Sequence, residues 1–564
     1  PGSQSWHMTS SQLDIDQKRG LGSAWNAVIH IQNIPVFYLP YLMFPIDDRR
    51  MSGVLTPTFG YSESSGSHLS APVYWNIAPN LDATITPAWY SDRGLQLNTE
   101  NRYLFAWHTG QIDLSYLDDD STNSERWFGK WSHLQRSANN ITTDVLIQEV
   151  SDDNFFEDFD SFNINDNTAH LERRVTVSHA GNSWDSALMW QDYQTLNPAT
   201  VTSARPYRRL PAFTLNSHFN SFDNGLEFNI QNEWVRFDRI NSLTGERLHM
   251  LPDLGWSNAN SYYFFKPKLE YGLTRYRLDN NTTGDDSISR GIPIFSIDSG
   301  LIFERTLSIQ SGWTQTLEPR LFLLSAPFEE QDDLPNFDSA ALTDSYSNFF
   351  QSNRFSGSDR IGDAKQLALG LRSRILDDDN GAELMFAQIG QIHYFQDRRV
   401  SLNGITETSK KSNIIAELGL SPNASLALKT KLVYSEKDEA LSQKEFTLNY
   451  RKNAIVTNIE YLFIDKTLEQ AGLSLVYPLN NLWTVLAKYQ QSLLFDKPVE
   501  NLFGLNYESC CWGIKILASR TSDDSFERID NAIYFELSLK GLTQTGQKIE
   551  HQLSQAIPGY RANF

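Results

Sequence analysis

The sequence has no long hydrophobic run. A helix that crosses a bilayer needs about 20 predominantly apolar residues, and the longest candidate, residues 34–46, is shorter than that. It is also interrupted by Pro35, Pro40 and Pro45. These features exclude a helical membrane protein. They do not exclude a transmembrane β-barrel, because lumen-facing polar residues keep the mean hydropathy low in such barrels, and here it is −0.42.

The chain also has few basic residues for its length. It carries 48 Lys and Arg against 68 Asp and Glu, a formal net charge of −20. Nucleic-acid binding requires a basic surface, so we expect no nucleic-acid partner. Acidic clusters lie between strand-like runs at residues 118–120, 152–153 and 377–379. They fit either solvated loops or cation-binding loops near anionic lipid headgroups, and none has the spacing of an EF-hand.

Catalytic and nucleotide-binding motifs are missing as well. The sequence contains no H-E-x-x-H, no G-x-S-x-G and no Walker A string, and its 11 histidines are scattered. We therefore predict that the protein is not an enzyme and has no cofactor or metal site. The alternative is a barrel enzyme whose Ser, His and Asp side chains converge only in the folded chain.

There are only two cysteines, the adjacent Cys510 and Cys511. Neighbouring side chains on a strand point to opposite faces, and a disulfide between them is strained, so we do not expect them to bond to each other. In an oxidising envelope each would seek a partner elsewhere. Either both are free, or their partners lie in an N-terminal part that precedes Pro1. The start at a proline rather than a methionine predicts a processed or truncated product.

From about residue 49 onward, the sequence alternates apolar and polar residues with a period of two, as at residues 226–231. One hairpin is legible over residues 446–463, with a turn at Lys452-Asn453. Another spans residues 473–489, with a turn at residues 478–481. This pattern is typical of strands with one apolar and one polar face. The aromatic content of 12% fits the interfacial girdles of a membrane barrel and also a carbohydrate-binding sandwich.

Residues 49–564 leave room for about 26 strands, at roughly 20 residues per spanning strand and connector. We find no sustained helical stripe, no fixed-length repeat and no Pro-, Gly- or Ser-rich linker. A soluble sandwich of this length would normally divide into domains. We therefore predict an all-β fold: one very large antiparallel transmembrane β-barrel over residues 49–564. Residues 1–48 are too short for a core of their own and are interpreted as the last strands of a preceding β-rich domain plus a connector.

Two prolines interrupt the first strand-forming runs of this expected barrel. Pro57 follows residues 54–56 and Pro72 precedes residues 73–75. Proline has no N–H to donate, so within sheets it belongs at an edge or a weakened position. If the sheet closes on itself, these strands form its seam. The simpler interpretation is two prolines at strand ends beside turns.

Several long strings resemble one known family, the LptD proteins that assemble lipopolysaccharide at the Gram-negative outer membrane. The resemblance is to their C-terminal barrel portion and spans the chain end to end. The start P-G-S-Q-S-W also resembles the point just after one of the family's N-terminal cysteines. The strings are P-V-F-Y-L-P-Y-L at 35–42, R-R-M-S-G-V-L-T-P at 49–57, Y-W-N-I-A-P-N-L-D-A-T-I-T-P at 74–87, F-F-E-D-F-D at 155–160, T-L-E-P-R at 316–320, Y-E-S-C-C at 507–511 and D-N-A-I-Y-F-E-L-S-L-K-G-L at 530–542.

The resemblance implies an integral outer-membrane barrel of about 26 strands, preceded by a periplasmic β-jellyroll of which residues 1–48 are the remnant. It implies an LptE-like lipoprotein plug in the lumen and an LptA-like periplasmic bridge that delivers lipopolysaccharide through the N-terminal domain. It also implies that Cys510 and Cys511 form two long-range disulfides with cysteines of that domain. Both of those partners are absent from this sequence.

The function implied is insertion of lipopolysaccharide into the outer leaflet. Its sugars need a wet lumen, while its acyl chains favour lipid by about 0.8 kcal/mol per CH₂. The molecule would therefore leave sideways, between the first and last strands. The alternatives are a passive porin or nutrient-uptake channel, which would be shorter, and a water-soluble tandem lectin-like protein. The residues expected at the lateral gate are Val54, Leu55, Thr56, Pro57, Pro72, Asn531, Ile533, Phe535 and Leu537.

Overall fold

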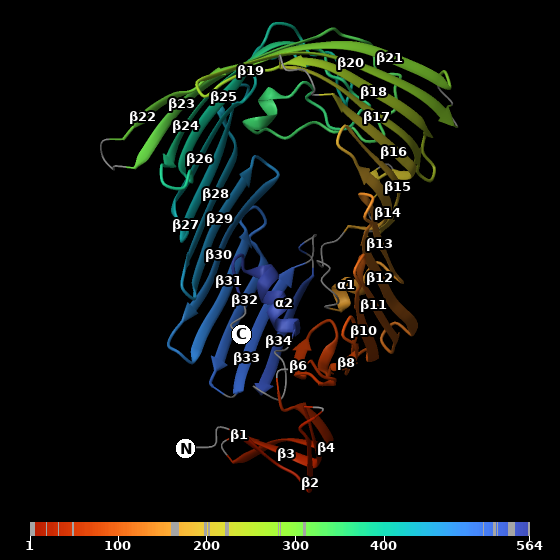
Figure 1. Ribbon diagram of the computed structural model, residues 1–564, viewed down its shortest axis with the longest axis vertical. Coiled ribbons are helices and arrows are strands. Elements are labelled where there is room, and N and C mark those ends of the chain that lie inside the picture. The colour runs from red at the N-terminus through yellow and green to blue at the C-terminus, as the bar shows by residue number, and fades with distance from the viewer. Residues whose placement is uncertain are drawn as a thin grey trace.

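In a computed structural model the chain forms a closed antiparallel β-barrel with a small separate sheet at one end (Figure 1). Among the residues described, no helix has both the length and the apolar character needed to cross a bilayer. The structure describes residues 6–18, 20–31, 33–47, 50–159, 169–196, 200, 204–219, 225–279, 281, 284–307, 312–510, 512–522, 526, 528–539 and 547–561.

The small sheet has β3 at its centre, with β4 on one side and β1 and β2 pairing with different halves of β3 on the other. Its buried residues Ala24, Ala27 and Leu42 pack together with Leu539 and Trp512 of the barrel. The sheet therefore lies against one end of the barrel, which we call the near end; the opposite end is the far end. The strands are β1 (Trp6–Thr9), β2 (Gln12–Asp16), β3 (Leu21–Ile31) and β4 (Ile34–Pro45).

The barrel closes through pairing of β34 with β6 and contains 26 antiparallel strands. This confirms the predicted fold class and strand number. Four of the strands are each split into two labelled segments: β5 with β6, β7 with β8, β18 with β19, and β21 with β22. The first half of the wall consists of β5 (Gly53–Val54), β6 (Thr58–Ser62), β7 (Gly66–Ser70), β8 (Val73–Ala78), β9 (Leu81–Tyr90), β10 (Gly94–Leu104), β11 (His108–Asp119), β12 (Ser124–Arg136), β13 (Ile141–Val150), β14 (His170–Ala180), β15 (Trp184–Thr195), β16 (Arg208–Phe219), β17 (Leu226–Asp238), β18 (Thr244–Trp256) and β19 (Asn258–Ala259).

The second half of the wall continues without a break back to the first strand, so that each strand pairs with a neighbour on both sides. Closure of this kind removes the exposed edges that an open sheet would present. It consists of β20 (Tyr263–Asp279), β21 (Ser287–Leu301), β22 (Phe303–Thr306), β23 (Trp313–Ala326), β24 (Ala364–Asp377), β25 (Glu383–Tyr394), β26 (Ile414–Asn423), β27 (Leu426–Ser435), β28 (Ala440–Lys452), β29 (Ile455–Ile464), β30 (Leu468–Pro478), β31 (Trp483–Ser492), β32 (Lys497–Glu508), β33 (Trp512–Ser522) and β34 (Ile529–Leu539).

The period-two pattern places apolar side chains outside and mixed side chains inside. On β11, Leu114 is 49% exposed, whereas its neighbours Asp113 and Ser115 are buried. β20 repeats the arrangement, with Leu273 exposed and Thr274 buried. An apolar outer face with a polar interior is the arrangement of transmembrane barrels. Both predicted hairpins are confirmed, as β28–β29 and β30–β31.

Within the described part of the chain, three short helical segments and one long connection lie inside the wall. The helices are α1 (Phe155–Asp158), the 3-10 helix η2 (Ser347–Phe350) and α2 (Gln547–Ala556). α2 carries a short apolar stripe, which the absence of a sustained helical stripe in the sequence does not exclude: Ile549, Leu553 and Ile557 form one face that packs against β29 to β34. The stripe is only three turns long, which is why it did not stand out in the sequence.

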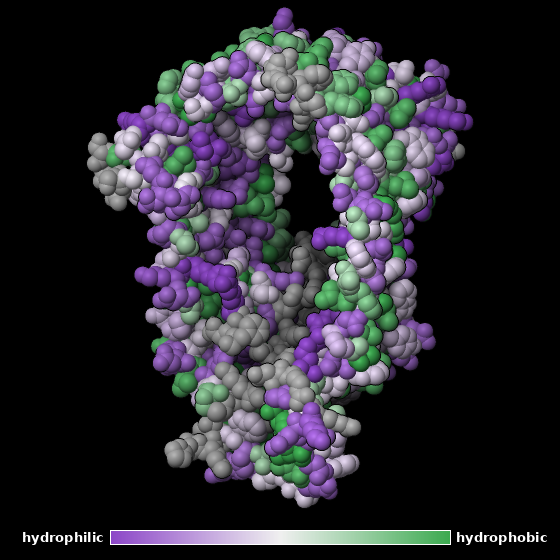
Figure 2. Space-filling view, in the orientation of Figure 1, coloured by the Kyte–Doolittle hydropathy of each residue, from purple (hydrophilic) through white to green (hydrophobic). Residues whose placement is uncertain are grey.

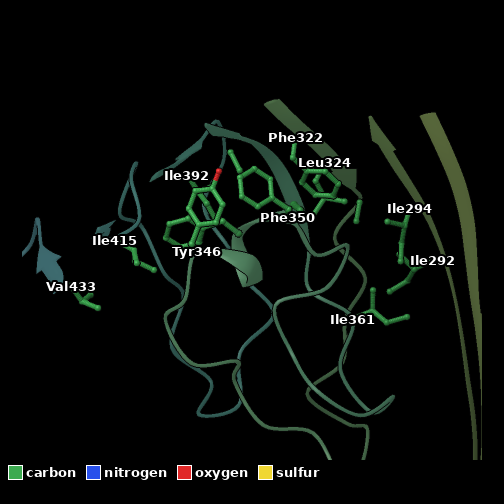
Figure 3. Close-up of a cluster of buried hydrophobic side chains, with 14 residues drawn as sticks. Ile292, Ile294, Phe322, Leu324, Tyr346, Phe350, Ile361, Ile392, Ile415 and Val433 are labelled. Atoms are coloured by element: carbon green, nitrogen blue, oxygen red, sulfur yellow. The ribbon is translucent and has the colours of Figure 1, made fainter. Parts of the chain in front are cut away.

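The connection between β23 and β24, residues 327–363, folds back onto the inner face of the barrel. Its Tyr346, Phe350 and Ile361 pack against inward-facing side chains of β21 and β23 to β27, including Ile292 and Ile415 (Figure 3). An opening through the middle of the molecule nevertheless remains visible in Figure 2. The lumen is therefore partly filled by the chain's own segments.

Candidate functional site at the barrel seam

The seam between the first and last strands is held by a short ladder. β34 pairs with β6 through five residue pairs, from Ala532 opposite Ser62 to Glu536 opposite Thr58. On its other side, β34 pairs with β33 through eleven, from Ile529 to Leu539. The last strand is therefore bonded far more extensively to its neighbour within the chain than across the closure.

Pro57 lies where the seam ladder ends. The next position along the register after Thr58 and Glu536 would place Pro57 opposite Leu537, and a proline has no N–H to donate there. β6 pairs on both sides, with β34 and β7, whereas before Pro57 only the pairing with the second strand continues, through Val54 opposite Val73 of β8. The end of the ladder thus coincides with the first of the two prolines.

Pro72 lies in the matching interruption of the second strand, between β7 and β8. Its carbonyl oxygen accepts a hydrogen bond of 2.8 Å from the backbone N–H of Leu55. Both prolines therefore mark breaks that divide each of the first two strands into a near-end and a far-end segment. Thr56, in the first of these breaks, is buried.

The predicted gate residues do not all lie on the ladder itself. Ile533 and Phe535 are opposite Tyr61 and Phe59. Leu537 lies beyond the last pair and is opposite Ile514 of β33 instead. Val54, Leu55, Thr56 and Pro57 precede β6 on the near-end side. The predicted set therefore lies partly on the ladder and partly beside its near-end limit, with Asn531 beyond its far end and Pro72 on the neighbouring strand.

Backbone approach across the seam is close at one glycine. A Cβ placed on Gly60 would lie 2.8 Å from the carbonyl oxygen of Ile533 and would also overlap Cε1 of His68. Only glycine fits such an approach without displacing backbone. His68 in turn lies against Tyr534, with ring centroids 5.5 Å apart. Neither Gly60 nor His68 was among the predicted site residues, because the approach exists only once the barrel is closed.

Side chains and turns add bonds at the far end of the seam. The N–H of Glu63 donates to the carbonyl oxygen of Asn531 at 3.2 Å, and the Asn531 Nδ2 donates to the Glu63 Oε2 at 3.0 Å. The N–H of Ser64 donates to Oδ1 of Asp530 at 3.0 Å. The far end is therefore bonded beyond the ladder, and it was represented among the predicted residues only by Asn531.

A buried charge network anchors the lumenal connection 327–363. Arg247 of β18 is fully buried and donates to Asp338 at 2.7 Å and to Asp359 at 2.6 Å. Burial alone would raise the pKa of Asp338, but the hydrogen bonds and charge of Arg247 lower it to about 2. Burial raises the pKa of Asp359. The guanidinium thus holds two carboxyl groups of one lumenal segment against the wall.

The cysteine pair lies at the near end. Cys510 is exposed in the turn between β32 and β33, next to Trp512, which packs against the small sheet. Cys511 lies outside the described residues. The predicted long-range disulfides stay a prediction. Among the residues described, no group of three or more His, Cys, Asp or Glu is placed to hold a metal ion.

Solved structures give no usable comparison. The FrpB iron transporter from Neisseria meningitidis (F3-3 variant) is aligned over 92% of this chain and 86% of its own, with 8% identity and a TM-score of 0.31. The siderophore receptor PirA from Pseudomonas aeruginosa is aligned over 92% and 85%, with 9% identity and a TM-score of 0.31. Similarity at this level carries no argument about fold or function.

Sequence comparison is decisive. Residues 124–483 match the family described as LptD, LPS transport system D. The chain is 38% identical to the LPS-assembly protein LptD of Nitrosococcus oceani over 570 residues, covering 100% of this chain and 77% of that protein. It is 34% identical to the LptD of Thiobacillus denitrificans, covering 99% and 77%, and 34% identical to that of Alcanivorax borkumensis, covering 100% and 76%. The chain therefore belongs to the LptD family of non-enzymatic lipopolysaccharide-transport proteins, and its barrel is an integral outer-membrane barrel.

Proposed function

We propose that this chain inserts lipopolysaccharide into the outer leaflet, with the sugars passing through the lumen and the acyl chains leaving sideways through the seam between β6 and β34. The observation that carries the proposal is the short seam ladder, which ends beside Pro57 after five residue pairs. Family membership supplies the substrate class.

The amphipathic nature of lipopolysaccharide explains why a lateral exit is needed. Each buried CH₂ of an acyl chain gains about 0.8 kcal/mol outside water, so several long chains would not enter a polar lumen. The outer wall beside the seam is apolar, as at the exposed Ile533 and Leu69. A molecule whose sugars stay inside while its chains contact this surface must cross the wall between two strands.

Opening at the seam costs less than opening the neighbouring pairing of β33 with β34. Each hydrogen bond contributes about 0.5–1.5 kcal/mol net in water, and unmet backbone groups in hydrocarbon cost more. Opening at the seam breaks five pairs, whereas separating β33 from β34 breaks eleven. The wall would therefore part between β6 and β34 before it parted between β33 and β34.

The partners expected from the family fit this arrangement. We propose that the β1–β4 sheet belongs to a periplasmic jellyroll that receives lipopolysaccharide from an LptA-like bridge, and that an LptE-like lipoprotein occupies part of the lumen. Contact of Leu539 with the sheet supports this proposal, because the end of the last strand then lies beside the proposed entry point. Co-purification of a lipoprotein with the barrel, lost when the lumenal wall is altered, tests the second partner. A passive porin or nutrient-uptake channel would need no such partner.

A photo-reactive amino acid tests the exit route. At Ile533, which is 48% exposed and lies on the seam, it should capture lipopolysaccharide in transit. At Leu432, which is 38% exposed on the outer face of β27, it should capture none above background. Equal capture at both positions, or none at Ile533 while export proceeds, would contradict the proposal.

A further inference from the structure

Residues 155–159, which belong to the string F-F-E-D-F-D, lie beside the far end of the seam. Phe155, Phe156 and Phe159 bury their rings against β9, β11 and β12, which holds α1 inside the wall. The rings continue toward the seam. Phe159 contacts Tyr90 with centroids 5.5 Å apart, and Tyr90 contacts His68 at 5.6 Å. The helix α1 is thus packed against the part of the wall that the first strands form.

Asp158 at the end of α1 is held by two buried arginines of that side. Its Oδ1 lies 2.8 Å from Nη2 of Arg93, and its Oδ2 accepts from Nη1 of Arg126 at 2.8 Å. Arg93 also donates to the carbonyl oxygen of Ser64, at 2.9 Å and 3.1 Å, in the turn between β6 and β7. Through Arg93, the carboxylate is therefore tied to the end of the first strand.

The same carboxylate is also reached from the last strand. Arg528, just before β34, places its Nη2 3.4 Å from Oδ1 of Asp158 and its Nη1 3.7 Å from Glu157. These groups are 370 positions apart in the sequence. Asp158 is therefore shared between Arg93, which holds the end of the first strand, and Arg528, which directly precedes the last strand.

We propose that Asp158 is a positioning residue that latches the far end of the seam, so that the β6–β34 ladder opens from the near end first and separates at the far end only when the Asp158–Arg528 contact is broken. The ladder ends at Pro57 on the near-end side, whereas the far end carries the additional bonds from Glu63 and Ser64. This inference rests on the proposed lateral gate, because it assigns an order to the gate's opening.

Hydrogen exchange of the intact protein in nanodiscs tests the latch. Arg528→Gln removes the charge from a side chain that is 47% exposed, so folding should not suffer. We expect exchange in residues 58–62 and 529–536 to accelerate about two- to fivefold, as expected for loss of one exposed ion pair. Exchange in β27 and β28 should not change. Arg528→Lys should restore most of the protection, which a loss of packing alone would not predict.

Arg236→Gln is the matched control. Arg236 is 48% exposed and also pairs with two carboxylates, Glu246 at 3.1 Å and Asp279 at 3.2 Å, but on β17. It should leave exchange at the seam unchanged. A second variant, Asp158→Asn, should accelerate seam exchange more than Arg528→Gln, because it removes a carboxylate shared by three arginines. The proposed role of Asp158 is contradicted if Arg528→Gln leaves seam exchange unchanged, as Arg236→Gln should. It is also contradicted if Arg528→Gln and Asp158→Asn accelerate exchange throughout the barrel.

The latch and the lateral gate fail in different ways. Hydrogen exchange measures how readily the β6–β34 ladder opens in the absence of substrate. It therefore reports on the Asp158–Arg528 contact whether or not lipopolysaccharide uses this route. Capture at Ile533 reports on the route without reference to Arg528. Faster exchange in Arg528→Gln without capture of lipopolysaccharide at Ile533 would contradict the lateral gate. The Asp158–Arg528 contact would then stabilise the seam without a role in export. Capture with unchanged exchange would overturn the latch alone.

Discussion

Gly60 and Ile533 approach each other across the seam so closely that a Cβ on Gly60 would lie 2.8 Å from the Ile533 carbonyl oxygen. The two residues belong to strands at opposite ends of the barrel sequence. Their contact exists only in the closed barrel, and it sets how near the first and last strands can lie.

Gly60→Ala should therefore loosen the seam. The added methyl group meets backbone, which cannot rotate away, and overpacking of this kind costs about 1–3 kcal/mol. We expect faster hydrogen exchange in residues 58–62 and greater entry of large antibiotics into cells. Gly129→Ala on β12 is the control, since its Cβ would have only an ordinary contact of 3.6 Å with Leu114. Equal behaviour of the two variants would show that the seam tolerates the added atom.

Pro57→Ala and Pro72→Ala should have the opposite effect. Each substitution supplies a backbone N–H that could extend pairing near the seam, and each new hydrogen bond would add about 0.5–1.5 kcal/mol. We expect slower delivery of lipopolysaccharide to the cell surface, measured by pulse labelling, with the double variant slowest. Pro252→Ala, within β18 and opposite Ile230, should deliver at the normal rate. Normal delivery in the double variant would show that Pro57 and Pro72 have no role in lipopolysaccharide export.

Arg247→Met should release the connection 327–363 from the wall. Asp338 and Asp359 would remain buried without their guanidinium, and breaking a buried ion pair by removing one partner costs about 3–5 kcal/mol. We expect this connection to become the first site of limited proteolysis while the barrel stays intact. Arg236→Met, at an exposed ion pair, should not change the cleavage pattern. If residues 327–363 stay resistant to protease in Arg247→Met, their apolar contacts alone are enough to hold the connection against the wall.

The sequence predicts the barrel well because alternation is a local property. Residues 446–463 display their hairpin within a few positions. A proline alone does not predict a break, since Pro252 lies within the unbroken β18. The latch could not be predicted in this way, because Asp158 and Arg528 meet only after closure. The helix α2 was missed for a different reason: its apolar face is only about three turns long. The string at residues 155–160 supported the family resemblance without revealing that residues 155–159 lie beside the seam.

The most direct test of the lateral gate is a reversible cross-link at the seam. Phe59 and Phe535 are directly opposite, a spacing in antiparallel pairs that suits a disulfide, so Phe59→Cys with Phe535→Cys should form one on oxidation. The control pair, Leu428→Cys with Leu448→Cys, is opposite between β27 and β28. We predict that oxidation stops lipopolysaccharide delivery only in the seam pair and that reduction restores it. Undiminished delivery through a fully cross-linked seam would contradict the account.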